Sequence, residues 1–154
     1  MNKPILYLMV GLPGSGKTTR AKEIEAAQNA VRFSPDEWIT DLYDHRYDHE
    51  HHEQARAQVE KLQWVLGKRL LALGQSVILE NGFWSRSDRQ RYRDEAQDLG
   101  AEVKLDYQDV SVDELWRRSS KRPETQEVGM LHFTKNDLEE WAVIFEAPTQ
   151  DELG

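Results

Sequence analysis

The chain alternates between short, almost wholly apolar runs and longer segments in which apolar residues recur every three or four positions. The short runs are typical of strands buried on both faces of a sheet, and the longer segments are typical of amphipathic helices. Strands are predicted at residues 5–10, 31–33, 76–80 and 103–107. Because strands that alternate with helices are joined by right-handed crossovers, the pattern predicts a three-layer α/β fold with a mostly parallel sheet of four or five strands.

Capping residues and apolar spacing mark the predicted helices. The sequence Ser34-Pro35-Asp36-Glu37 is typical of a helix entry, with Ser34 as the N-cap and proline at the first helical position. The longest helix is predicted for about residues 53–73, where the apolar residues at helical spacing are Val59, Leu62, Val65, Leu66 and Leu70. The last helix is expected to begin at Thr134 and to carry on its buried side Leu138, Trp141 and Phe145.

The segment between the first predicted strand and the first helix is a complete G-x-x-x-x-G-K-[ST] motif. Its glycines allow successive backbone N–H groups to converge on phosphate oxygens, and the following helix adds the positive end of its dipole. Lys17 is expected to reach the β- and γ-phosphates of a nucleotide, and Thr18 is expected to offer its hydroxyl to Mg²⁺. The alternative is a glycine-rich turn without a ligand. The predicted nucleotide-binding residues are Gly11, Leu12, Pro13, Gly14, Ser15, Gly16, Lys17, Thr18 and Thr19.

Two carboxylates are predicted at the carboxyl edge of the sheet, where ligands gather in folds of this class. Glu80 ends the third predicted strand and is a candidate ligand for Mg²⁺ opposite Thr18. Asp36 follows the second predicted strand and is the candidate general base, because an acceptor hydroxyl must lose its proton during phosphoryl transfer. The alternatives are a solvated acid at position 80 and, at position 36, an acid that only favours the helix dipole.

Several arginines are candidates for contacts with anionic groups. Arg118 and Arg122 share a helix face ahead of a polar loop, and they are expected to close over the nucleotide within a lid at about residues 117–132. Arg86, in the loop after Glu80, is the candidate for gripping an acceptor molecule. A solvated, charged helix surface is the alternative for these side chains.

Two further features flank the predicted cleft. Trp38 and Trp84 are placed to stack on a planar ligand, although tryptophans more often belong to the core. The segment 45–52 is rich in histidine, and the spacing of His45 and His49 on one helix face would suit a metal ion. A polar segment that overhangs the acceptor pocket is favoured over a zinc site, because the sequence has neither cysteine nor an H-E-x-x-H motif.

Composition narrows the classes of function. The chain has 154 residues, which suits one compact domain, predicted to cover residues 1–154. A formal net charge of -8 disfavours a general nucleic-acid binder, although a short nucleotide can still bind locally. The absence of cysteine fits a reducing cytoplasm, and the first apolar run is too short to span a bilayer. We therefore expect a cytoplasmic protein without a membrane segment, and its oligomeric state is left open.

With these residues in view, the chain resembles the small P-loop kinases of the zeta toxin, polynucleotide kinase and chloramphenicol phosphotransferase group, which are AAA-type ATP-binding proteins. By this resemblance, Asp36 matches the aspartate that activates the acceptor, and Arg118 and Arg122 match the lid arginines. The resemblance covers nearly the whole chain and rests on residues 11–18, 34–37, 77–86, 118, 122 and 145–149.

The sequence departs from the polynucleotide kinases three residues after Asp36, where Ile39 stands instead of an arginine that grips a substrate phosphate. We therefore expect an ATP- and Mg²⁺-dependent phosphotransferase that acts on a hydroxyl of a small molecule. The alternatives are a polynucleotide or nucleotide 5′-kinase and, in another class, a nucleotide-dependent switch or binding module without phosphoryl transfer. A GTPase switch is disfavoured because the sequence has no N-K-x-D motif.

Overall fold

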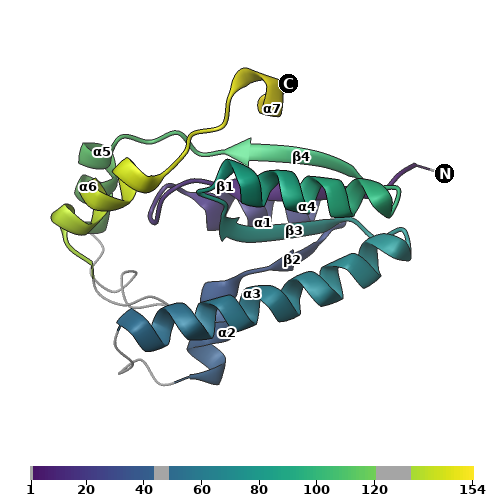
Figure 1. Ribbon diagram of the computed structural model, residues 1–154, viewed down its shortest axis with the longest axis horizontal. Helices are drawn as coiled ribbons and strands as arrows, with labels where there is room; N and C mark the ends of the chain where they lie inside the picture. Colours follow the sequence, from purple (N-terminus) through teal and green to yellow (C-terminus); the bar gives the residue numbers. More distant parts are fainter. Residues whose placement is uncertain (1, 44–48, 121–132) are drawn as a thin grey trace.

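A computed structural model of the chain describes residues 2–43, 49–120 and 133–154, without the side chains of His49, Glu50 and Ser120. It contains one parallel four-stranded sheet, in the order β2-β3-β1-β4, with helices between the strands (Figure 1). This arrangement confirms the predicted α/β fold. The elements are β1 (Ile5–Val10), α1 (Lys17–Gln28), β2 (Val31–Phe33), α2 (Pro35–Leu42), α3 (His49–Ala72), β3 (Val77–Gly82), α4 (Arg86–Asp98), β4 (Glu102–Tyr107), α5 (Val112–Ser120), α6 (Lys135–Ile144) and α7 (Gln150–Leu153).

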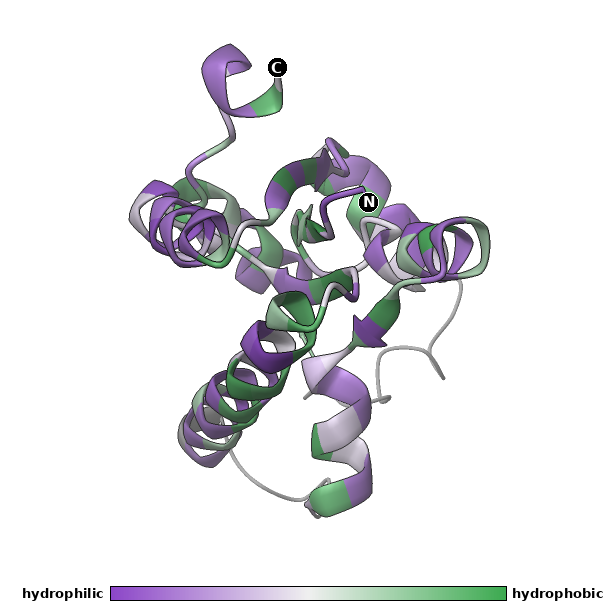
Figure 2. Ribbon diagram, turned by 90° about the vertical axis from the view of Figure 1, so that its right-hand side faces the viewer, coloured by the Kyte–Doolittle hydropathy of each residue, from purple (hydrophilic) through white to green (hydrophobic). Residues whose placement is uncertain are grey.

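The central strand β1 is buried on both faces because helices cover the sheet from both sides (Figure 1). Its alternate side chains Leu6, Leu8 and Val10 pack with residues of α3 and α4, whereas Tyr7 and Met9 pack with residues of α1. The covering helices carry both hydrophilic and hydrophobic residues, as amphipathic helices do (Figure 2). The three layers therefore follow directly from the period-two alternation of the strands.

The helices α5 and α6 form a separate small core next to the loop that follows β1. Leu12 of this loop is buried together with Leu115 of α5, with Leu138 of α6 and with Phe133, which precedes α6. Thr134 caps α6 by accepting a hydrogen bond from the backbone N–H of Asp137, and the Asp137 carboxylate accepts one from the backbone N–H of Thr134. The predicted start of this helix is confirmed, and the small core fixes α5 and α6 against the loop.

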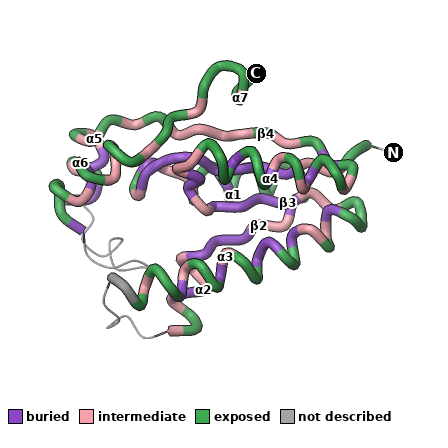
Figure 3. Tube along the Cα trace, viewed as in Figure 1, coloured by how far each residue is buried: buried purple, intermediate pink, exposed green. Residues whose placement is uncertain are grey.

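The long helix α3 differs from its prediction in where it begins and in which side it buries. It begins at His49 instead of about residue 53, and buried, intermediate and exposed positions follow one another along it (Figure 3). Leu62, Val65 and Leu66 are 53%, 47% and 41% exposed. The buried positions are Ala55, Val59, Gln63, Trp64, Gly67 and Leu71, of which the sequence pattern predicts only Val59. Gly67 lies next to the sheet, since a Cβ there would be in ordinary van der Waals contact with Cγ1 of Val77, at 3.5 Å. The side of α3 that is buried is therefore the side that faces β3.

Gln63 is fully buried, and neither its Oε1 nor its Nε2 has a hydrogen-bond partner among the residues that the structure describes. An amide buried without a partner costs about 1–3 kcal/mol. We expect Gln63→Met, which keeps an unbranched side chain, to raise the free energy of unfolding by about 1 kcal/mol, measured by urea denaturation. The matched control is Gln58→Met at an exposed position of the same helix, which should change stability little. A loss of stability in Gln63→Met would contradict the expectation.

No helix in the described part of the chain is both long enough and apolar enough to cross a membrane.

Candidate active site

The loop from Gly11 to Gly16 joins the central strand to α1 and brings backbone N–H groups to the carboxyl edge of the sheet. Gly16 occupies the N-cap position of α1 with φ 98°, a left-handed conformation that favours glycine. No side chain caps this helix end, and its first turn contains no acidic residue. The N–H groups at the start of α1 therefore suit an external anion such as a phosphate group.

Lys17 lies back over this loop. Its ammonium group donates hydrogen bonds to the backbone carbonyls of Gly11 and Leu12, both at 3.0 Å. Burial lowers the pKa of Lys17 to about 8, and the nearby carboxylates of Asp36 and Glu80 oppose this effect. The charge of Lys17 is therefore close enough to both predicted carboxylates to interact with them.

Thr18 and Glu80 meet because β1 and β3 are neighbours in the sheet. The hydroxyl of Thr18 donates a hydrogen bond of 2.7 Å to Oε1 of Glu80, whose side chain is almost fully buried. A hydroxyl and a carboxylate side by side are the oxygen ligands that Mg²⁺ prefers. These two residues fit the predicted metal site in their chemistry and position.

Arg32 of β2 is a site residue that sequence reasoning missed. Its Nη1 lies 2.5 Å from Oε2 of Glu80, and its guanidinium also binds Glu37 of α2. An arginine in the middle of a three-residue apolar strand requires a charged partner, and this was the signal available in the sequence. Arg32 holds the Glu80 carboxylate from the side opposite Thr18.

Asp36 lies in the first turn of α2, just after β2, as predicted, and this helix is capped by Ser34, which accepts a hydrogen bond from Glu37 N. Arg56 of α3, also missed, donates a hydrogen bond of 2.6 Å from Nη1 to Oδ1 of Asp36. Within the described residues, Oδ2 of Asp36 accepts no hydrogen bond. The candidate base therefore has one oxygen held by Arg56 and one that no described residue holds.

Trp38 and Trp84 both have partners within the protein. The ring of Trp38 packs edge-on against Phe33, with 5.9 Å between the ring centroids. Trp84 donates a hydrogen bond of 3.4 Å from Nε1 to the carbonyl of Gly11, and its ring lies 5.9 Å from that of Trp141. These contacts give both tryptophans packing roles, and ligand stacking by either stays a prediction.

Arg86 points to the C-terminal helix and not to open space. Its guanidinium donates hydrogen bonds to Thr149 Oγ1 at 2.7 Å and to Asp151 Oδ2 at 2.8 Å, and lies 3.5 Å from Glu152 Oε2. An acceptor could be held by Arg86 only if these contacts were given up.

Arg118 donates a hydrogen bond of 3.0 Å to Glu114 one turn earlier in α5. Hydrogen bonds from Arg117 and Arg118 lower the pKa of Glu114 to about 2. Helix α5 passes close to the loop from Gly11 to Gly16, which we call the phosphate loop. A Cβ at Gly14 would lie 3.4 Å from Oγ of Ser119. Arg122 and most of the predicted lid, like the histidine-rich residues 45–48, lie outside the described residues.

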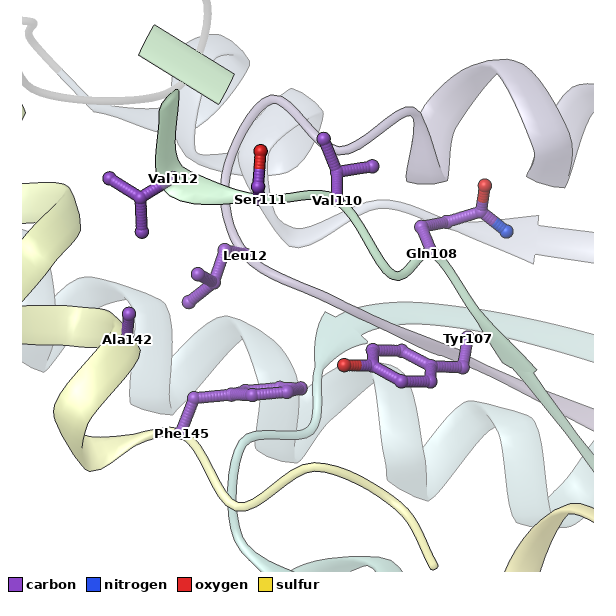
Figure 4. Close-up of a pocket in the computed structure, with 8 residues that line it drawn as sticks. All are labelled: Leu12, Tyr107, Gln108, Val110, Ser111, Val112, Ala142 and Phe145. Atoms are coloured by element: carbon purple, nitrogen blue, oxygen red, sulfur yellow. The ribbon is translucent and has the colours of Figure 1, made fainter. Parts of the chain in front are cut away.

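A separate cavity of about 220 Å³ lies between the phosphate loop, the end of β4 and α6 (Figure 4). Leu12, Val112 and the ring of Phe145 give it a largely apolar lining. Because β4 flanks β1 on the side away from β3, this cavity lies across β1 from Glu80 and Asp36. It is therefore distinct from the place where Thr18 meets Glu80.

Comparisons with known proteins agree with this geometry. A family model described as "AAA domain" matches residues 6–148. A candidate kinase from Chloroflexus aurantiacus has a similar structure, with a TM-score of 0.81 and 22% identity over 99% of this chain and 85% of that chain. A chain of the Pnkp1/Rnl/Hen1 RNA repair complex has a TM-score of 0.71 and 25% identity, covering 94% of this chain and 44% of that chain.

Kti12 from Chaetomium thermophilum, solved in complex with ADP-AlF3, has a TM-score of 0.65 and 19% identity over 94% of this chain and 81% of that chain. A comparison with curated protein sequences found no match. The structural likeness to the Chloroflexus protein and to Kti12 concerns the fold, since both identities are low.

Proposed function

Because this chain belongs to the AAA-domain family whose model spans residues 6–148, we propose that it is an ATP- and Mg²⁺-dependent kinase that phosphorylates a hydroxyl group of a small-molecule acceptor. The family match confirms the resemblance to P-loop kinases, whose fold binds nucleotides. The observation that carries the proposal is the meeting of Lys17, the Thr18–Glu80 pair and Asp36 at one edge of the sheet.

The phosphate groups of ATP are assigned to the loop and to the start of α1. The free N–H groups of this helix end bind phosphate oxygens, and Lys17 leaves the carbonyls of Gly11 and Leu12 to reach the β- and γ-phosphates. Thr18 and Glu80 would hold Mg²⁺, which supplies positive charge to the same phosphates. Arg118 and Arg122 are assigned to the lid, where they neutralise charge on the transferred group.

We assign to Asp36 the role of general base, which takes the proton of the acceptor hydroxyl. As the acceptor oxygen bonds to the γ-phosphorus, the bond from that phosphorus to the bridging oxygen breaks and ADP leaves with the electron pair. The hydroxyl proton moves to Oδ2 of Asp36, the oxygen that accepts no hydrogen bond from the described residues. This assignment places the acceptor between α2 and the phosphate loop.

A polynucleotide 5′-kinase is the second candidate, favoured by the likeness to a chain of the RNA repair complex. Two observations oppose it. The net charge of -8 does not suit a polyanionic substrate. Ile39 is buried in α2, so this position packs into the protein instead of offering a cation to a phosphate.

The experiment is an ATP-consumption screen with Mg²⁺ against nucleosides, sugars, aminoglycosides and hydroxyl-ended oligonucleotides, using the wild type and Asp36→Asn. We expect a small-molecule acceptor to stimulate ADP formation, and Asp36→Asn to lower this stimulated rate about 100-fold with ATP binding unchanged. The matched control is Asp41→Asn at an exposed position of α2.

Three results would contradict the proposal in different ways. Stimulation by oligonucleotides alone would favour the 5′-kinase. Tight ATP binding without stimulation by any acceptor would favour the switch or binding module. Normal turnover by Asp36→Asn would remove Asp36 from the role of base.

A further inference from the structure

Arg56 connects three elements of the site. From α3 it donates to Oδ1 of Asp36 in α2 at 2.6 Å and to the backbone carbonyl of Asn81 in β3 at 3.2 Å. Its Nε also donates to Glu60, one turn later in its own helix, at 2.8 Å. Its side chain is only 25% exposed, so these contacts are made in a partly desolvated place. One guanidinium therefore fixes the distance between α2, α3 and the end of β3.

The charge of Arg56 is already balanced. Two carboxylates, Asp36 and Glu60, bind the single guanidinium from different sides. An arginine that grips an anionic substrate needs uncompensated positive charge, and Arg56 does not have it. Its geometry instead suits the orientation of a neighbouring side chain.

We propose that Arg56 is a positioning residue that holds Oδ1 of Asp36 and so leaves Oδ2 as the oxygen that takes the acceptor proton. This inference rests on the proposed function, in which Asp36 is the general base. In this role Arg56 acts through Asp36 and does not itself bind the phosphates or the acceptor. Its contact with the Asn81 carbonyl ties the orientation of the base to the strand that carries Glu80.

The kinetic test compares Arg56→Gln with the wild type. In this variant the Asp36 carboxylate is held less firmly, so a smaller fraction of bound acceptors is correctly oriented toward it. We therefore expect kcat to fall about 10-fold to 100-fold while the KM values for ATP and for the acceptor change less than about threefold. The matched control is Arg69→Gln, which removes an exposed arginine from the same helix and should leave kcat unchanged. An unchanged kcat in Arg56→Gln would overturn the inference, and so would a raised KM for the acceptor with kcat retained, because that pattern belongs to a substrate-binding residue.

A second measurement does not depend on turnover, so it separates failure of this inference from failure of the proposed function. The thermal midpoints of Arg56→Gln, Asp36→Ala and the double variant form a double-mutant cycle. If Arg56 and Asp36 hold each other, the double variant loses clearly less than the sum of the two single losses. Additive losses would show that the two side chains are not coupled and would overturn the inference even if the wild type is an active kinase.

Discussion

Replacing Lys17 with alanine is expected to lower kcat about 10³-fold, the largest effect on activity of any single change in this chain. Lys17 is the one charged residue of the G-x-x-x-x-G-K-[ST] motif. Its ammonium group lies at hydrogen-bond distance from the carbonyls of Gly11 and Leu12. In the proposed phosphoryl transfer, negative charge moves toward the β–γ bridging oxygen, where this ammonium group would stabilise it. The measurement is acceptor-stimulated ADP formation under saturating ATP.

The control for Lys17→Ala is Lys22→Ala, which removes an exposed lysine from the same helix and should leave kcat within about twofold of the wild type. The thermal midpoint of both variants shows whether the fold is retained. Turnover by a folded Lys17→Ala protein within threefold of the wild type would mean that the loop binds phosphate without taking part in its transfer.

Glu152→Ala is expected to lower the free energy of unfolding by about 3–5 kcal/mol, a large share of the stability of a domain this size. Arg89 of α4 is 1% exposed, and its guanidinium binds both carboxylate oxygens of Glu152 in α7, at 2.7 and 3.2 Å. Its third partner is the carbonyl of Phe83 at 2.8 Å. Without Glu152, a buried guanidinium would keep its charge and lose the carboxylate that balances it.

Urea denaturation at neutral pH measures this loss, and Asp151→Asn is the matched control. Asp151 belongs to the same helix and pairs with Arg86, but its side chain is 67% exposed, so its removal should have little effect. A loss no greater for Glu152→Ala than for Asp151→Asn would mean that the buried pair contributes little to stability.

The stabilisation by Glu152 also depends on pH. Its hydrogen bonds with Arg89 lower the pKa of Glu152 below the ordinary value of 4.5. A carboxyl group with a lowered pKa stabilises the fold above its ordinary pKa, and this contribution is lost as the pH falls through the pKa of the folded state. The stability difference between the wild type and Glu152→Gln should therefore shrink as the pH is lowered from neutrality to below 4.5.

The features that local sequence determines were predicted correctly. The four strands, the loop after β1 and the caps at Ser34 and Thr134 depend on residues close together in the chain, so their patterns are visible without the fold. The meeting of Thr18 with Glu80 was also predictable, because parallel strands bring their carboxyl ends to one edge.

The features that depend on distant contacts were not predicted. The buried side of α3 faces β3, and apolar spacing alone identified the buried Val59 but also pointed to Leu62, Val65 and Leu66, which are exposed. Arg32 and Arg56 reach carboxylates on other elements, and only the folded chain shows these partners. Arg86 was predicted to face an acceptor because α7 was not predicted, and α7 supplies its partners.

The order of the strands also bears on how such an enzyme can be changed. The phosphate loop follows β1, which is paired on both sides. Asp36 follows β2, which lies at the edge of the sheet among the described residues and pairs with β3 through Val31, Arg32 and Phe33. Helix α2 and the part of α3 beside it pack against each other away from the central strand. If the acceptor binds at α2, as proposed, mutation can reshape its site while the strands around the loop after β1 keep their core. For protein engineering, substitutions on α2 and the first turns of α3 are the natural library for retargeting this scaffold to new alcohols.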